Sequence, residues 1–289
     1  MKIQCEKCDN EYYYALERCP HCAHPGNYSN VLIAADSAER DTVVKRYESA
    51  LRGADSRGCR PTFEDFASWL RNSRAVVARS FADIDRLAAR DNSVQATFYD
   101  LIDAGLALPD GSSWESLRRP ADEILFPNYR ARIRFGALSG DGIGVINYGH
   151  FWMTMRDSLI EHRASVFDQN SVTLVTEILA SKRLEVAPES LKGHRAIWPD
   201  RATLAAAQLS HAITPSTLSD DFPRILLMQG ATTADDKFIE VNIWGPITVR
   251  TIESVGYRWS LVSRMTPRSL LRHLAASLKV FGVKLEERP

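Results

Sequence analysis

The sequence predicts an α+β protein with three parts in chain order: a small metal-binding ribbon, a helical segment and a mixed second half. Three observations carry this prediction. Four of the five cysteines lie within the first 22 residues. Apolar residues recur at three- and four-residue spacing from residue 34 to residue 108, and short β-prone runs punctuated by Gly, Asp, Asn and Pro follow. We place the domains at residues 1–30, 31–118 and 119–289.

The ribbon is predicted from two CxxC pairs that are separated by ten residues. Each pair forms a tight knuckle, and the intervening residues are enough for a short hairpin that brings four thiolates into the tetrahedron preferred by Zn²⁺. The expected ligands of this structural zinc are Cys5, Cys8, Cys19 and Cys22. Because four cysteines complete the shell, His21 and His24 are interpreted as bystanders, and Cys59 as an ordinary free thiol.

The partner of the ribbon is not fixed by its composition. Tyr12, Tyr13 and Tyr14 either stack on nucleic-acid bases or pack the ribbon itself. The ribbon has slightly more acidic than basic residues, so its charge gives no reason to expect that it binds nucleic acid.

Composition excludes some classes of protein. Lysine plus arginine and aspartate plus glutamate each number 36, so the net charge is zero, which argues against a strongly basic, nonspecific nucleic-acid binder. No run of about 18 apolar residues predicts a membrane span. The N-terminus lacks the apolar stretch of a signal peptide. We therefore expect a cytoplasmic protein without a membrane partner.

The helical segment is predicted from capping signals and a 3.6-residue period. Thr62 begins a capping sequence ahead of Phe66 and Trp69, and Asn92 opens a further helix. The apolar positions assigned to the helical period include Val76, Val77, Phe81, Ile84 and Leu87, followed by Phe98, Leu101 and Ile102. The aromatic stripes are interpreted as core rather than as ligand contacts.

The second half alternates strands and helices. The predicted strands are Tyr129–Phe135, Phe151–Met155, Ser165–Phe167, Ile225–Gln229, Phe238–Trp244 and Tyr257–Val262. The predicted helices are Asn170–Ala180, Arg201–Ala207 and Pro267–Val280.

Four short motifs follow one another in this half. They are Arg132-Ile133-Arg134-Phe135-Gly136-Ala137-Leu138, Tyr148-Gly149, Arg163-Ala164-Ser165 and Glu240-Val241-Asn242-Ile243-Trp244-Gly245-Pro246. Each motif alone is typical of an ordinary half-buried strand. In this order they resemble the mono-ADP-ribosyltransferase fold of bacterial toxins over roughly residues 120–289. The resemblance implies an ADP-ribosyltransferase-like β-sandwich core with flanking helices.

The resemblance also assigns roles to residues. The catalytic set would be Arg132, Ser165 and Glu240. Arg132, or alternatively Arg134, would bind the pyrophosphate of NAD through its planar guanidinium. Ser165 would support the nicotinamide ribose and the glutamate. Glu240 would bind the ribose 2′-hydroxyl, stabilise the oxocarbenium-like state and help to deprotonate the acceptor. Residues expected to contact NAD are Arg132, Arg134, Gly136, Tyr148, Ser165 and Asn242.

Two departures from the family pattern concern the acceptor more than NAD. The family usually has Gln two residues after the catalytic Glu and His before Gly-Pro, where this chain has Asn242 and Trp244. Asn keeps an amide on a shorter arm, and Trp keeps an aromatic ring without a titratable nitrogen. Tyr148 either stacks on the nicotinamide ring or belongs to the core.

The predicted function is that of an NAD-dependent ADP-ribosyltransferase acting as a toxin or defence effector inside a bacterial cell. NAD would be the substrate and a nucleic acid, possibly RNA, is slightly favoured over a protein as the acceptor. The resemblance also implies a neutralising antitoxin partner, as in toxin–antitoxin or phage-defence systems. Two alternatives stay open: a non-enzymatic zinc-ribbon module that binds nucleic acid or protein, and an NAD glycohydrolase.

Overall fold

The computed structural model describes residues 2–5, 7–13, 18–24, 26, 28–97, 99–100, 105, 113–127, 129–182 and 188–289. The predictions made for Tyr14, Phe98, Leu101 and Ile102 lie outside these residues. None of the described helices is long and apolar enough to cross a lipid bilayer.

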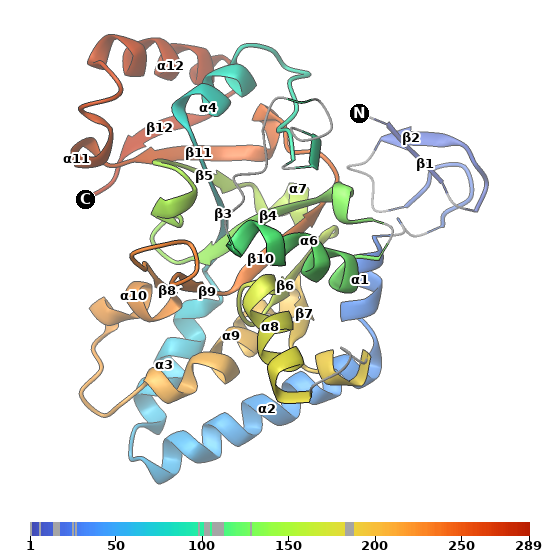
Figure 1. Ribbon diagram of the computed structural model, residues 1–289, viewed down its shortest axis with the longest axis vertical. Helices are drawn as coiled ribbons and strands as arrows, with labels where there is room; N and C mark the ends of the chain where they lie inside the picture. Colours follow the sequence, from blue (N-terminus) through green and yellow to red (C-terminus); the bar gives the residue numbers. More distant parts are fainter. Residues whose placement is uncertain are drawn as a thin grey trace.

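The N-terminal third contains the ribbon and a set of helices around one strand. The ribbon consists of β1 (Lys2–Gln4) and β2 (Glu11–Tyr13), and it lies to one side of the molecule (Figure 1). The elements that follow are α1 (Ser29–Ala34), α2 (Ser37–Ser56), α3 (Arg60–Leu70), β3 (Arg74–Arg79) and α4 (Phe81–Ala88).

The remaining elements alternate between strand and helix. The first group is α6 (Ser113–Leu125), β4 (Ile133–Ser139), β5 (Phe151–Met155), α7 (Asp157–Ile160), β6 (Ala164–Phe167), α8 (Ser171–Lys182) and β7 (Arg195–Ile197). The second group is α9 (Arg201–Leu209), α10 (Phe222–Leu226), β8 (Leu227–Met228), β9 (Lys237–Phe238), β10 (Glu240–Trp244), β11 (Ile252–Tyr257), α11 (Trp259–Val262), α12 (Arg268–Val280) and β12 (Lys284–Glu287).

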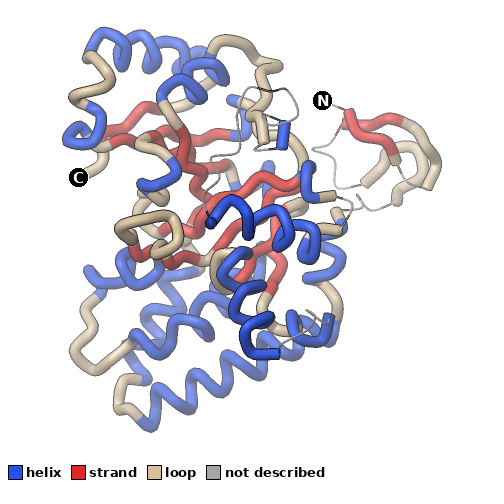
Figure 2. Tube along the Cα trace, in the orientation of Figure 1, coloured by secondary structure: helices blue, strands red, loops and turns tan. Residues whose placement is uncertain are grey.

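Eight strands form one mixed sheet in the order β12-β11-β5-β3-β4-β10-β6-β7. Neighbouring strands are antiparallel except for β11 and β12, which are parallel. The strands occupy the centre of the molecule and helices flank them (Figure 2). The class predicted from the sequence, a mixed α and β fold preceded by a cysteine ribbon, is therefore confirmed.

The prediction of a helix through Val76 and Val77 is wrong, because these residues lie in β3. All four interior residues of this strand are buried, so both of its faces contact apolar neighbours. β-Branched valines suit such a strand. The helix begins only after Ser80, whose Oγ accepts a hydrogen bond from Asp83 N at 3.2 Å. β3 lies between β4 and β5 and pairs with both. Strands from both sides of the predicted domain boundary at residue 119 therefore belong to one sheet.

The eight-stranded sheet is nearly divided into two halves. β3 and β4 pair only from Arg74 to Val76 and from Ala137 to Ser139. Beyond these residues β3 continues to pair with β5, whereas β4 continues to pair with β10. The two strands therefore diverge and form a fork. The sheet therefore has two four-stranded halves joined by three residue pairs, and the ADP-ribosyltransferase-like β-sandwich stays a prediction.

The two faces of the sheet differ in their cover. Val241 and Ile243 of β10 point into the main core, which includes residues of α2, α3, α9 and α12. Side chains alternate along a strand, so Glu240, Asn242 and Trp244 face the other side. There α6 and α8 pack over a smaller cluster. The candidate site lies on this second face.

Some of the other predicted helices and strands are confirmed and others are wrong. β5, α8, α9 and α12 confirm their predictions closely. The strand predicted at Tyr257–Val262 is wrong, because β11 ends at Tyr257 and α11 begins at Trp259. β4 begins at Ile133 rather than at Tyr129, since Arg130–Arg132 form a 3-10 turn.

Candidate functional site

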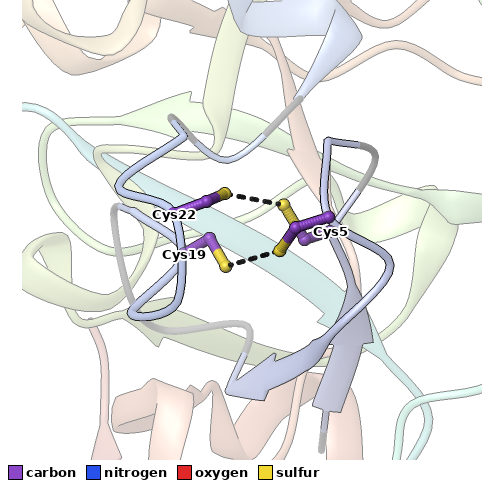
Figure 3. Close-up of side chains that lie close together, drawn as sticks. Cys5, Cys19 and Cys22 are labelled. Carbon is purple, nitrogen blue, oxygen red and sulfur yellow. Dashed lines mark hydrogen bonds between the residues drawn. The ribbon is translucent and has the colours of Figure 1, made fainter.

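The four cysteines of the ribbon form one cluster. Their sulfur atoms all lie within 4.8 Å of one another, with Cys5 and Cys22 separated by 3.5 Å and Cys8 and Cys19 by 3.6 Å. Figure 3 shows the thiols of Cys5, Cys19 and Cys22 turned toward a common centre. Four sulfurs around Zn²⁺ at about 2.3 Å would stand roughly 3.8 Å apart. The cluster could therefore hold a tetrahedral metal ion.

The two knuckles have matching backbone geometry. Cys5 O accepts from Asp9 N, and Cys19 O accepts from Ala23 N, each at 2.8 Å. Asp9 and Ala23 have φ of 54° and 56°, the left-handed conformation that closes each turn. This repeated turn aims both sulfurs of each pair toward the same point.

One thiol is already biased toward the form that binds metals. Hydrogen bonds from the backbone and side-chain amides of Asn10 lower the pKa of Cys8 to about 6. Metal ions bind the thiolate rather than the thiol. His21 and His24 are not members of the cluster. Cys59 lies outside the ribbon and is buried, with its Sγ 3.4 Å from Ile213 O.

A second candidate site is a cavity of about 210 Å³ at the fork between β3 and β4. Its apolar lining comes from β3, from β4, from the segment before Ile146 and from β9. These residues are Val76, Ala78, Ile133, Phe135, Gly136, Ala137, Val145 and Phe238. Its polar lining is Arg79, Gln95, Thr97, Tyr99, Arg118, Arg134, Tyr148, Asn170 and Glu240. We call this cavity the fork pocket.

Gly136 allows the strands to approach where the fork begins. A Cβ on this residue would lie 2.8 Å from Val76 O and 3.0 Å from a methyl group of Val77. Any side chain would force β3 and β4 apart at the residues that join the two halves of the sheet.

Glu240 is the buried carboxylate of the fork pocket, with 1% of the residue exposed. Its Oε2 accepts hydrogen bonds from Ser171 N at 3.3 Å and from Ser171 Oγ at 3.2 Å, at the start of α8. Its Oε1 has no hydrogen-bond partner among the described residues. Burial raises the pKa of Glu240 to about 7, against the opposing effect of the nearby Arg118 guanidinium.

Arg118 connects Glu240 to a network on α6. Its guanidinium lies 4.2 Å from the centre of the Phe135 ring, and its Nε is 3.5 Å from Asp122 Oδ2. The same carboxylate oxygen accepts from Tyr99 OH at 2.7 Å. Arg118 therefore covers the sheet face beside Glu240 while Asp122 partly balances its charge.

Two further arginines give the fork pocket an excess of positive charge. Arg79 forms no ion pair with a described carboxylate, and its burial lowers its pKa to about 10. The hydrogen-bond donors around Gln95 favour the amide orientation in which its oxygen faces Arg79. In this orientation the Gln95 oxygen accepts a hydrogen bond from Arg79 Nε at 2.9 Å. Arg134 Nη2 lies 3.7 Å from Asp100 Oδ2, and its Nε has no partner in the described structure. The pocket can therefore bind an anion near the arginines and stabilise a cation near Glu240.

The predicted NAD-contacting residues divide into two groups. Arg134, Gly136, Tyr148 and Glu240 line the fork pocket. Arg132 is exposed on the 3-10 turn before β4, and it does not line the pocket. It therefore does not share a strand face with Arg134.

Ser165 and Asn242 lie deeper on the same face. They are directly paired across β6 and β10, and both are buried. Asn30 of α1 donates from Nδ2 to Ser165 Oγ at 3.1 Å, to Asn242 O at 3.0 Å and to Arg163 O at 3.3 Å. Neither side chain lines the fork pocket. Ser165 therefore contacts the strand of Glu240 by direct strand pairing and through Asn30, and the hydrogen bonds to the Glu240 carboxylate come from Ser171 instead.

Sequence reasoning missed several pocket residues. Arg79, Gln95 and Arg118 come from outside the stretch that resembles a known family. Asn170, which lines the pocket, and Ser171, which donates to Glu240, could have been found, since they lie at the start of a correctly predicted helix. Asn170 Oδ1 accepts from Val172 N at 2.9 Å, while its buried Nδ2 lacks a partner among the described residues.

Neither the models of known protein families nor the curated protein sequences match this chain. The geometry of the two sites is therefore the main guide to function.

Proposed function

We propose that the protein is an NAD-dependent ADP-ribosyltransferase whose active site is the fork pocket. One observation carries the proposal: a buried carboxylate with an unpartnered oxygen shares a pocket with arginines that lack full charge compensation. NAD has matching chemistry, with an anionic pyrophosphate at its centre and a cationic nicotinamide ring at one end. The order of the sequence motifs that resemble the toxin family supports the same assignment.

The size of the fork pocket indicates how NAD would bind. Its volume of about 210 Å³ is below the roughly 300–1,000 Å³ of sites that enclose a drug-sized ligand. It would hold the nicotinamide ribose, with the remainder of NAD extending past the mouth. Arg134 and Arg79 would bind the pyrophosphate, and Arg134 takes the role that the resemblance assigned first to Arg132. Tyr148 lies on the pocket wall against Phe238 and would contact the nicotinamide.

The proposed reaction exchanges one bond at the anomeric carbon for another. The glycosidic C–N bond breaks, and its electron pair leaves on the nicotinamide nitrogen, which neutralises the ring. The ionised Glu240 carboxylate stabilises the positive charge that develops on the ribose. A nucleophile of the acceptor then bonds to the same carbon, and its proton passes to Glu240.

The raised pKa of Glu240 fits both of these roles. At a pKa of about 7 the residue exchanges protons readily near neutral pH. The positive ring and ribose of bound NAD would favour the ionised form and lower this pKa. Ser171 holds one oxygen in place, which leaves the other for the substrate.

The ribbon is proposed to bind one structural zinc ion through Cys5, Cys8, Cys19 and Cys22. Four cysteine ligands leave no open coordination position, so the ion would hold the ribbon together rather than take part in the reaction. The ribbon would help to select a macromolecular acceptor, with nucleic acid favoured over protein. The proposed setting is a toxin or defence effector inside a bacterial cell, restrained by an antitoxin.

The test is incubation of the full zinc-bound chain with lysate and NAD labelled in its adenylate part. We expect label in a macromolecule, release of nicotinamide, and loss of both by at least about 10³-fold in Glu240→Gln. Glu48→Gln is the matched control, because Glu48 is an exposed residue of α2. Sensitivity of the label to nuclease or to protease identifies the acceptor class.

The two alternatives give different results in the same experiment. Nicotinamide release without labelled macromolecules would identify an NAD glycohydrolase. Absence of any NAD turnover with nucleic-acid and protein acceptors would refute the enzyme and favour a binding module.

A further inference from the structure

A second cavity opens on the same face of the sheet as the fork pocket. Its volume is about 610 Å³, and most of its lining is polar. The lining residues are Arg74, Gly140, Asp141, Gly142, Thr154, Arg156, Glu253, Ser254, Gly282, Lys284, Glu286 and Arg288. We call it the β5–β12 cavity, after the outer strands that form its floor.

The floor is a row of hydrogen-bond donors across three strands. Thr154 of β5 pairs with Ser254 of β11, and Ser254 pairs with Lys284 of β12. Paired residues point to the same face of a sheet, so two hydroxyls and an ammonium group lie side by side. Arg156, two residues after Thr154, extends the row along the chain.

The cations and carboxylates of the β5–β12 cavity do not cancel evenly. Arg74 pairs with Glu253, and Arg288 pairs with Glu286 at 2.6 Å. The lining contains one other carboxylate, Asp141, whose Oδ1 accepts from Ser139 Oγ at 3.0 Å and from Ile143 N at 2.9 Å.

Two lining cations have no carboxylate partner within the described residues: Arg156 and Lys284. Arg156 is held in place by backbone oxygens, since Nε donates to Ile252 O and Nη2 to Gly282 O. The cavity therefore presents a guanidinium held by backbone oxygens and an exposed ammonium to any ligand that enters.

The strongest sign of a ligand is the Thr154 hydroxyl. Thr154 is 6% exposed, and its Oγ1 has no hydrogen-bond partner among the described residues. A buried hydroxyl without a partner destabilises the folded protein, and a ligand that accepts its hydrogen bond would remove this cost. Gly142, with φ of 76°, and the Arg288 guanidinium lie next to this hydroxyl in the cavity lining, since a Cβ on Gly142 would lie 3.5 Å from Thr154 Oγ1 and 3.1 Å from Arg288 Nη2.

We propose that the β5–β12 cavity binds a phosphate group of a nucleotide or a polynucleotide, through Lys284, Arg156 and the hydroxyls of Thr154 and Ser254. Phosphate oxygens accept hydrogen bonds from hydroxyls, ammonium and guanidinium groups together. This site is separate from the fork pocket and does not depend on the proposed reaction.

The position of the cavity relates it to Glu240. Thr154 of β5 pairs with Val76 of β3, and Val76 pairs with Ala137 of β4. Ala137 in turn pairs with Glu240 of β10, so these four residues form one row across the sheet. Three strand spacings place Thr154 roughly 14 Å from Glu240. If the fork pocket transfers ADP-ribose to a nucleic acid, a backbone phosphate of that acceptor would reach the β5–β12 cavity.

The test is calorimetric titration of the full zinc-bound chain with inorganic phosphate, AMP and a short single-stranded oligonucleotide. We expect Thr154→Val and Lys284→Met each to weaken phosphate binding about tenfold, a difference of about 1.4 kcal/mol. Lys279→Met is the matched control, because it removes the same charge from the exposed end of α12. Thr154→Val keeps the side-chain shape, so its unfolding temperature should equal or exceed that of the wild type.

The three probes distinguish the source of the phosphate. AMP binding as tightly as the oligonucleotide indicates a mononucleotide site, and tighter oligonucleotide binding that weakens steeply with salt indicates a polynucleotide. The proposal is overturned if none of the probes binds at millimolar concentration, or if both variants bind them as the wild type does. Loss of NAD turnover in Glu240→Gln with unchanged phosphate binding keeps the two sites distinct.

Discussion

The cysteine ribbon and the fork pocket differ in how far apart along the chain their residues lie. The ribbon gathers its four sulfurs from 18 consecutive positions, Cys5 to Cys22, through two local turns. The fork pocket gathers its lining from residues as distant as Val76 and Glu240, through strand pairing. The comparison shows that a site made by local turns can fold around a ligand, whereas a site made by a sheet exists only once the whole sheet has formed.

The largest expected effect tests whether the ribbon is independent. Removal of zinc by a chelator, or Cys19→Ser, should unfold the ribbon, because structural zinc contributes about 10–16 kcal/mol in comparable peptides. Asn30 anchors α1 to β6 and β10, so unfolding should stop before the sheet. Cysteine reactivity reports the ribbon, and calorimetry with NAD reports the fork pocket. Loss of NAD binding without wider unfolding would show that the two regions are coupled.

The next effect tests the cost of placing a carboxylate in the fork pocket. Burial raises the pKa of Glu240 from its ordinary 4.5 to about 7, so the folded protein holds this proton more tightly than the unfolded chain does. The associated stability is fully present below pH 4.5 and is lost as the pH rises to about 7. Glu240→Gln should therefore be more stable than the wild type by on the order of 3 kcal/mol at about pH 8.

Urea unfolding of both proteins across this pH range measures the difference. It should vanish at about pH 4, where Glu240 is protonated in the folded and the unfolded state. A constant difference at all pH values would mean that the carboxylate is not buried as described.

A smaller effect tests the residues that join the halves of the sheet. Gly136→Ala places a methyl group 2.8 Å from Val76 O and should destabilise the protein by about 1–3 kcal/mol. Gly53→Ala in α2 is the control, because its Cβ would meet only the end of the Arg57 side chain. That change should stabilise the helix by about 0.5–1 kcal/mol. Equal melting temperatures for the two variants would argue against close approach at the fork.

The smallest effect concerns Ser171, which donates to Glu240 Oε2. Ser171→Ala removes the hydroxyl hydrogen bond and should raise the pKa of Glu240 by less than one unit, equivalent to about 1 kcal/mol. The pH midpoint of NAD turnover should move upward by the same amount. A downward shift would contradict the assigned direction of the hydrogen bond.

The ribbon could be predicted from the sequence because its determinants are local. The spacing of four cysteines specifies the turns, and the structure places their sulfurs together as expected. The helices α8, α9 and α12 could be predicted for the same reason, since their apolar periods and starting residues are contiguous. Glu240, Arg134, Gly136 and Tyr148, which belong to the ordered motifs, all line the fork pocket.

The remaining parts of the fork pocket depend on pairing between distant segments. Val76 and Val77 fit a helical period, and nothing near them in the sequence reveals that β4 and β5 will flank them. Arg79 therefore could not be placed in the same pocket as Glu240. Arg132 and Arg134 are two residues apart, yet a 3-10 turn ends between them and leaves only Arg134 in the pocket.

The location of β3 limits how this chain can be divided. A fragment of residues 119–289 would contain β4 and β5 but not the strand that separates them in the sheet. Both strands would then present unpaired backbone edges, which are templates for association between chains. Such a fragment would aggregate, or would exchange strands with a second copy, unless residues 74–79 were supplied in trans. The sheet is therefore the smallest unit that can be transplanted or expressed, and a circular permutant that keeps β3 between β4 and β5 is preferable to a truncation.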